Sequence, residues 1–144
     1  MKTTAQSMPS WIEFHDSELI SAARSDLEVS IVLDAYVHRW EDGNPRRGTG
    51  WMQQIRLIVG MAVASIPTLA APAPIAVGEI RIGPLSHSNL VKMPIKSEEP
   101  VSLKIQLVTG EILEVAGEAV RSESIGEARY VEDLPADLWP GHSG

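Results

Sequence analysis

The chain has 144 residues, of which 44% are hydrophobic, close to the average of globular proteins, and this predicts one domain with one core. It contains no cysteine, which excludes disulfides, thiol nucleophiles, cysteine-ligated zinc and iron–sulfur clusters. The formal net charge is −7. The sequence lacks the clustered Lys and Arg that bind a phosphate backbone or an anionic membrane, so neither nucleic acid nor a membrane surface is an expected partner.

The acidic excess lies in the last third of the chain. Residues 1–96 carry nine basic and nine acidic side chains, whereas residues 97–144 carry three basic and ten acidic ones. Such an excess forms either a solvated surface that keeps the protein soluble or a face for a basic partner. The sequence leaves both interpretations open.

The longest uncharged segment, residues 57–78, has the length of a transmembrane helix but the wrong composition. Pro67, Pro72 and Pro74 would each remove a backbone donor inside the span, so no membrane span is expected. The N-terminus also lacks the apolar stretch of a secretory signal, which predicts a cytoplasmic protein. The expected organisation is a flexible segment at 1–9, a single all-β domain at 10–135 and a flexible tail at 136–144.

The first candidate elements are residues 10–15 and 18–24. We expect a turn at Asp16-Ser17 to separate them, because these side-chain oxygens compete with backbone pairing. Residues 27–40 alternate in polarity and predict a half-buried strand. Its inward face is expected to hold Val29, Ile31, Leu33, Ala35 and Val37. Its other face is expected to hold Ser30, Asp34, Tyr36 and His38.

Residues 41–50 contain three glycines and a proline and predict a long connection. Residues 51–63 repeat the alternation and predict the antiparallel partner of residues 27–40. Their expected inward side chains are Ile55, Leu57, Val59, Met61 and Val63. The Ala/Pro segment at 67–74 predicts an extended loop, because proline cannot donate to a β-ladder. Ile80 and Ile82 mark a short strand after it.

Residues 84–100 are expected to be irregular, with a brief strand at 90–93. A hairpin of residues 101–108 and 112–121 folds around a three-residue loop, Thr109-Gly110-Glu111, which places Leu107 opposite Leu113. A short strand at 128–131 precedes the tail. Seven or eight strands without βαβ alternation predict an all-β fold with little helix, either an antiparallel β-sandwich or a partly open barrel.

Histidines and carboxylates suggest one candidate site. The four histidines do not show the spacing of a local metal motif, so neither a metal ion nor a cofactor is expected. A metal-assisted hydrolase remains an alternative if the fold brings together His15, Asp16, Asp34 and His38. The other interpretation is that these residues have no role in binding. In that case His15-Asp16 forms a turn, and Asp34, Tyr36 and His38 lie on a solvated face of their strand.

The loop at 41–50 suggests a second candidate site. Trp40 and Trp51 bracket this loop and predict either a pocket at its mouth or an ordinary closure of the core. Arg46 and Arg47 form a candidate anion-binding tip, or simply an exposed charged loop. Gly48-Thr49-Gly50 lacks the lysine of a phosphate-binding loop, and the glycine–serine pattern of a nucleophile elbow is missing from the chain.

Three sets of segments carry a resemblance. FHDSEL (Phe14–Leu19), AYVHRW followed by GTGW (Ala35–Trp40 and Gly48–Trp51) and GEARYVEDLP (Gly126–Pro135) resemble a small bacterial protein family with no established function. The resemblance spans most of the chain and implies a self-contained single domain. It implies no activity, ligand or catalytic residue.

The expected function is a non-catalytic binding or protein-interaction module. Its partner is unknown, and self-association through an exposed strand edge or the apolar segment at 66–77 is one form of it. A small apolar-ligand carrier is a further alternative beside the metal-assisted hydrolase. No catalytic residue is assigned. The candidate ligand-binding residues are His15, Asp16, Tyr36, His38, Trp40 and Trp51, with Arg46 and Arg47 for an anion.

Overall fold

The computed structural model describes residues 9–41, 44, 46–69 and 72–139, and it confirms an antiparallel all-β fold. It has twelve strands instead of the expected seven or eight, because bends and bulges divide several expected segments. The strands are β1 (Ser10–Ser25), β2 (Glu28–Trp40), β3 (Gly48–Gly60), β4 (Val63–Ser65), β5 (Ala73–Ile82), β6 (Leu85–Ser88), β7 (Leu90–Met93), β8 (Lys96–Ser97), β9 (Val101–Leu107), β10 (Ile112–Gly117), β11 (Ala119–Ser124) and β12 (Arg129–Leu134).

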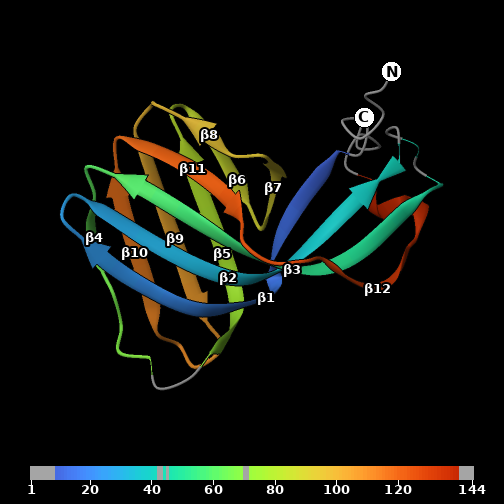
Figure 1. Ribbon diagram of the computed structural model, residues 1–144, viewed down its shortest axis with the longest axis horizontal. Coiled ribbons are helices and arrows are strands. Elements are labelled where there is room, and N and C mark those ends of the chain that lie inside the picture. The colour runs from blue at the N-terminus through green and yellow to red at the C-terminus, as the bar shows by residue number, and fades with distance from the viewer. Residues whose placement is uncertain (1–8, 42–43, 45, 70–71, 140–144) are drawn as a thin grey trace.

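The strands form two layers that share one edge (Figure 1). The front layer runs β1-β2-β3-β11-β8, and the back layer runs β4-β10-β9-β5. The two layers pair where Glu18 and Leu19 of β1 lie opposite Pro74 and Ala73 of β5, and the sheet does not close. Alternate side chains of both layers meet in the main core, which includes Ile31, Leu33, Leu57, Ile80, Leu103 and Ile105.

One end of the front layer extends beyond the sandwich (Figure 1). This extension, the arm, consists of residues 10–13 of β1, 36–40 of β2, 48–52 of β3 and the whole of β12. It has its own apolar cluster on the face turned away from the main core, formed by Tyr36, Trp40 and Leu134 with Trp11, Met52 and Trp139 packed against them. The expectation of a single core is therefore wrong, because the long strands bury different faces in the sandwich and in the arm.

Two glycines allow the arm to pack. A Cβ atom at Gly48 would overlap the indole of Trp40, and one at Gly50 would overlap the phenol of Tyr36. The two rings therefore lie directly on the backbone of β3, where any side chain would displace them. This close approach explains the glycines of the GTGW segment.

The turn predicted at Asp16-Ser17 is wrong, because β1 continues through it as one long strand with a bulge. Glu13 pairs with Tyr36 and Glu18 with Asp34, so four residues of β1 lie opposite Ala35 alone. The three extra residues reverse the inward and outward faces of the strand. Ile12 and Phe14 are buried before this reversal, and Leu19 after it.

The predicted pairing of residues 27–40 with 51–63 is confirmed for β2 and β3 up to Gly60. Ile55, Leu57 and Val59 are buried as expected. Met61 and Val63 are not, with 57% and 72% of their surfaces exposed. The chain bends here because Met61 has a φ of 50° and the Ala62 amide donates to the Leu27 carbonyl in the β1–β2 turn.

The predicted hairpin forms, with a different register. Its loop is Val108-Thr109-Gly110, since the Leu107 amide donates to the Glu111 carbonyl. Leu113 consequently pairs with Ile105 instead of Leu107, a shift of two residues that keeps the apolar side chains on one face. Its second half divides at Gly117, where β10 leaves the back layer and β11 joins the front one.

Other expected boundaries also differ. The segment expected to be irregular at 84–100 contains β6 and β8 besides the predicted strand β7. The expected loop at 67–74 ends earlier, because β5 begins at Ala73 and includes Pro74 at the junction with β1. The segment at 136–139, assigned to the tail from the sequence, forms the 3-10 turn Ala136–Leu138 and places Trp139 against Trp40.

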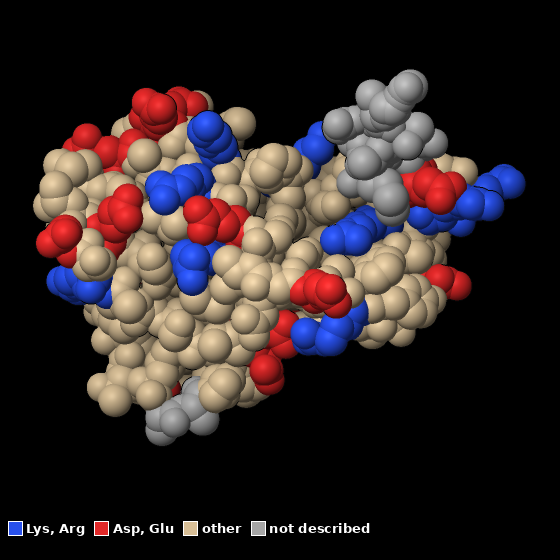
Figure 2. All heavy atoms as spheres, viewed as in Figure 1, with Lys and Arg blue, Asp and Glu red and all other residues tan. Residues whose placement is uncertain are grey.

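The acidic residues of the last third do not form one face. Glu114 lies on the outer side of the back layer, whereas Glu123 on the front layer lies within ion-pair distance of Arg56 and Arg121. Figure 2 shows acidic and basic side chains interspersed over the viewed face. A solvated surface of mixed charge therefore describes this region. Within the described residues, no helix has the length and apolar character needed to cross a membrane.

We predict that Gly50→Ala destabilises the protein by about 1–3 kcal/mol, since the new methyl group must displace the Tyr36 ring. Gly60→Ala is the matched control, because a Cβ there would lie 3.9 Å from its nearest neighbour, the Cβ of Ala119. Urea denaturation of both variants measures the difference. Equal stabilities would contradict the packing described for the arm.

Candidate functional site

The bulge of β1 is held from outside by Asn89, which lies between β6 and β7. Asn89 has a φ of 66°, a conformation that asparagine tolerates better than most residues. Its carbonyl accepts from the Phe14 amide (2.8 Å), and its side-chain Oδ1 accepts from the His15 amide (2.7 Å). One residue thus satisfies two backbone donors that the bulge removes from the ladder.

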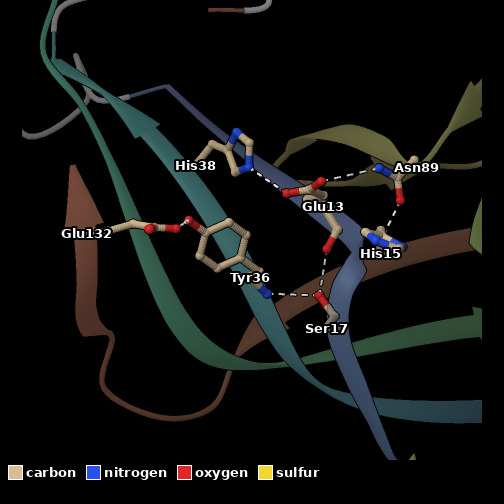
Figure 3. A network of polar contacts seen from close by, with 7 residues as sticks. All are labelled: Glu13, His15, Ser17, Tyr36, His38, Asn89 and Glu132. Atoms are coloured by element: carbon tan, nitrogen blue, oxygen red, sulfur yellow. Dashed lines mark hydrogen bonds and ion pairs between the residues drawn. The ribbon is translucent and has the colours of Figure 1, made fainter. Parts of the chain in front are cut away.

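Ser17 holds the bulge from inside. Its hydroxyl donates to the Glu13 carbonyl (2.7 Å) and accepts from the Tyr36 amide (2.8 Å), and the side chain is buried. The serine therefore replaces the missing pairing between β1 and β2. Figure 3 shows how Ser17, Glu13 and Tyr36 meet at this point.

Glu13 and His38 form a hydrogen bond on the outer face of the arm. The Nε2 atom of His38 lies 2.9 Å from Oε1 of Glu13 (Figure 3). The hydrogen bond from His38 holds the pKa of Glu13 below its ordinary value. Partial burial and the nearby Glu13 carboxylate raise the pKa of Asp16. The pKa values of the two carboxyl groups thus shift in opposite directions, because the bond from His38 outweighs burial at Glu13, whereas burial and the Glu13 carboxylate outweigh the histidines at Asp16.

Tyr36 contacts a second carboxylate. Its hydroxyl donates to Oε2 of Glu132 on β12, and its ring meets the His38 ring edge to face, with centroids 5.3 Å apart. Burial and the bond to Glu132 raise the pKa of the Tyr36 phenol. Tyr36 therefore stays protonated and links β2 to β12.

Two buried polar atoms of the arm have no hydrogen-bond partner among the residues that the structure describes: Nδ1 of His38 and Nε1 of Trp40. The indole N–H of Trp40 is therefore a donor without a partner among the described residues. The two side chains are two residues apart on one face of β2.

The four residues of the hydrolase hypothesis do not converge. Asp34 binds Arg129 (3.1 Å), and the His15 ring is bonded to the Ala76 carbonyl (2.9 Å), whereas His15, Asp16 and His38 each interact electrostatically with Glu13. The described residues contain no group of three or more His, Asp or Glu side chains arranged to hold a metal ion. The solvated face expected for Tyr36 and His38 is also wrong, since both side chains are buried under the arm cluster.

The loop residues do converge on a pocket. This arm pocket has a volume of about 480 Å³ and lies between the start of β3 and the end of β12. It is lined by Glu41, Arg46, Arg47, Gly48, Thr49, Trp51, Asp133 and Leu134. Trp40 does not line it and is fully buried on the other face, so the two tryptophans that bracket the loop separate.

Neighbouring groups fix the Trp51 ring. Its Nε1–H donates to Oγ1 of Thr49 (2.8 Å), the Tyr130 ring meets it edge to face, and the Arg39 guanidinium lies 4.9 Å from its centroid. Of the eight candidate residues, Trp51, Arg46 and Arg47 therefore share a pocket, and Tyr36 and His38 share a buried network.

The sequence analysis missed the residues that organise this region, namely Glu13, Ser17, Asn89 and Glu132. Glu13 precedes the FHDS segment and Ser17 is its last residue, and their polarity on an apolar strand was a usable signal. Asn89 and Glu132 are distant in sequence from the residues that they contact. Only the three-dimensional pairing identifies them.

Comparison of the chain with protein-family models, with curated proteins and with solved structures finds no match. The resemblance to a bacterial family therefore stays a prediction. Function must be argued from the geometry of the arm.

We predict that Glu13→Gln lowers stability at pH 7 by about 1.5–3 kcal/mol, the range for a hydrogen bond to a charged group. Because folding lowers the pKa of Glu13, its contribution is present above the unfolded pKa of about 4.3 and is lost as the pH falls through the folded pKa. Denaturant melts between pH 7 and pH 3 should therefore show the variant and the wild type converging in acid.

Asp16→Asn should have the opposite effect. Folding raises the pKa of Asp16, so its ionised form opposes folding at neutral pH and the variant should be at least as stable as the wild type there. Glu118→Gln, at an exposed position, is the control for loss of one negative charge. Equal pH profiles for Glu13→Gln and Glu118→Gln would contradict the assigned network.

Proposed function

We propose that the protein is a non-catalytic binding module that holds a small anionic ligand in the arm pocket. The observation that supports this most directly is that two arginines and a tryptophan line one pocket of about 480 Å³. This volume lies within the ordinary range of small-ligand sites. The proposal includes no chemical step.

The pocket is lined by two arginines and two carboxylates, and their pairing leaves Arg46 available to an anion. Arg47 is already paired with Glu41 (2.9 Å), and Asp133 accepts from the Tyr130 hydroxyl (2.7 Å). Arg46, in contrast, has no ion pair with any residue that the structure describes. A free guanidinium binds a carboxylate or phosphate through two parallel hydrogen bonds, which gives both affinity and orientation.

The remaining walls favour an apolar body attached to the anionic group. Trp51 and Leu134 supply apolar surface, and the Trp51 ring is fixed by Thr49 and Tyr130 before any ligand arrives. A wall that is already ordered loses little conformational entropy on binding. A flat ring that carries a carboxylate, such as benzoate, matches these features.

The buried network of the arm supports a structural role for the other candidates. His38 and Tyr36 are bound to Glu13 and Glu132, and the Ser17 hydroxyl is bound to two backbone groups. These bonds fix the strands that carry the pocket. The metal-assisted hydrolase gains less support, because its four residues have different partners.

Titration with benzoate tests the proposal. The expected result is a saturable shift of the Trp51 indole N–H resonance, identified by its loss in Trp51→Phe, with smaller shifts for benzamide and for benzylamine. Arg46→Glu should abolish the shift, because it reverses the unpaired charge. Lys104→Glu, on the outer side of the back layer, makes the same charge change away from the pocket and should keep the shift. No shift with benzoate, or the same loss in both variants, would overturn the proposal.

A further inference from the structure

A bulge in β12 turns the Asp133 side chain toward the arm pocket. Tyr130 pairs with Trp51 and Asp133 pairs with Thr49, so β12 has one residue more than β3 between these two pairs. In a regular strand, residues three apart point to opposite faces of the sheet. The extra residue brings Asp133 to the face of Tyr130, whose hydroxyl donates to Oδ1 of Asp133 (2.7 Å). Bulges commonly re-aim a side chain in this way beside functional sites.

Asp133 keeps one carboxylate oxygen available in the pocket. It lines the arm pocket and forms no ion pair with any residue that the structure describes. Tyr130 bonds to Oδ1, whereas Oδ2 has no hydrogen-bond partner among the described residues. An ionised carboxylate can only accept hydrogen bonds. The pocket therefore contains a free acceptor in addition to the free guanidinium of Arg46.

The charges that line the arm pocket sum to zero. Glu41 and Arg47 form an ion pair with each other (2.9 Å), whereas Arg46 and Asp133 do not. A ligand that carries only a carboxylate would bind Arg46 and add a second negative group to the pocket that contains Asp133. Like charges in one site disfavour binding. A ligand that also brings a hydrogen-bond donor satisfies both unpaired groups.

We propose that the ligand of the arm pocket is an aromatic carboxylate with a hydroxyl group on its ring, and that Asp133 selects this hydroxyl. The proposal rests on the binding function proposed above and adds a second polar contact to it. The ligand carboxylate binds Arg46, the ring lies against Trp51, and the hydroxyl donates to Oδ2 of Asp133. Because Asp133 is exposed, water bonds to it when the donor is missing, and the selection is modest.

Hydroxybenzoates are the probes, titrated against the Trp51 indole N–H resonance. The tighter-binding of 3-hydroxybenzoate and 4-hydroxybenzoate should bind about threefold or more tightly than benzoate, as expected for one added hydrogen bond. Its methoxy analogue lacks the donor and should bind no more tightly than benzoate. Equal affinities for benzoate and both hydroxybenzoates would overturn the selection of a hydroxyl and leave the proposed function intact. Failure of all these ligands to bind would overturn both.

Asp133→Asn tests the assigned residue. An amide has one acceptor oxygen, which Tyr130 occupies, and its nitrogen can only donate, so this variant should still bind benzoate but no longer prefer the hydroxybenzoate. Tyr130→Phe is the matched control, because it removes the bond to Asp133 and keeps both the carboxylate and the ring against Trp51. It should keep the preference. A preference that persists in Asp133→Asn, or that is lost in both variants, would contradict direct contact between Asp133 and the ligand.

Discussion

The bulge of β1 is the constraint on which the arm depends. Four residues of β1 lie opposite one residue of β2, and this reverses the two faces of the strand between the sandwich and the arm. Ser17 and Asn89 make the bulge stable, because they bind the backbone groups that would otherwise remain unpaired inside the protein. Glu13 is brought to the outer face of the arm by the same reversal, where it meets His38.

A second packing layer on the outer face of the sheet follows from this arrangement. Tyr36 and Trp40 lie on the glycines of β3, and Leu134 and Trp139 cover them. The arm thereby has its own apolar cluster. Trp51, Arg46 and Arg47 line the pocket beside it, and this is the physical basis for the binding function proposed above. The segments that carry the resemblance to a bacterial family, FHDS, AYVHRW, GTGW and GEARYVED, all lie in or beside this unit.

The sequence predicts the fold class and the central pair of strands. Polar and apolar residues alternate along a strand wherever the strand is regular and one of its faces is buried, and the sequence shows this alternation. It predicts the hairpin of β9 and β10 with the right faces and a register two residues away, since a shift of two preserves the alternation. It does not predict the continuity of β1, in which two bulges change the phase of the pattern. The pocket residues Arg46 and Trp51 are predictable because they flank one loop. Asn89 and Glu132 act across more than 70 residues of chain, so no local pattern indicates them.

Amide hydrogen exchange in Ser17→Ala tests the central claim most directly, because this substitution removes the hydroxyl that replaces the missing pairing in the bulge. If the arm is a unit that depends on the bulge, amides at 36–40 and 48–52 should exchange faster in the variant, while those of β9 and β10 keep their wild-type protection. Unchanged exchange in the arm, or an equal increase in the arm and in the back layer, would contradict the account.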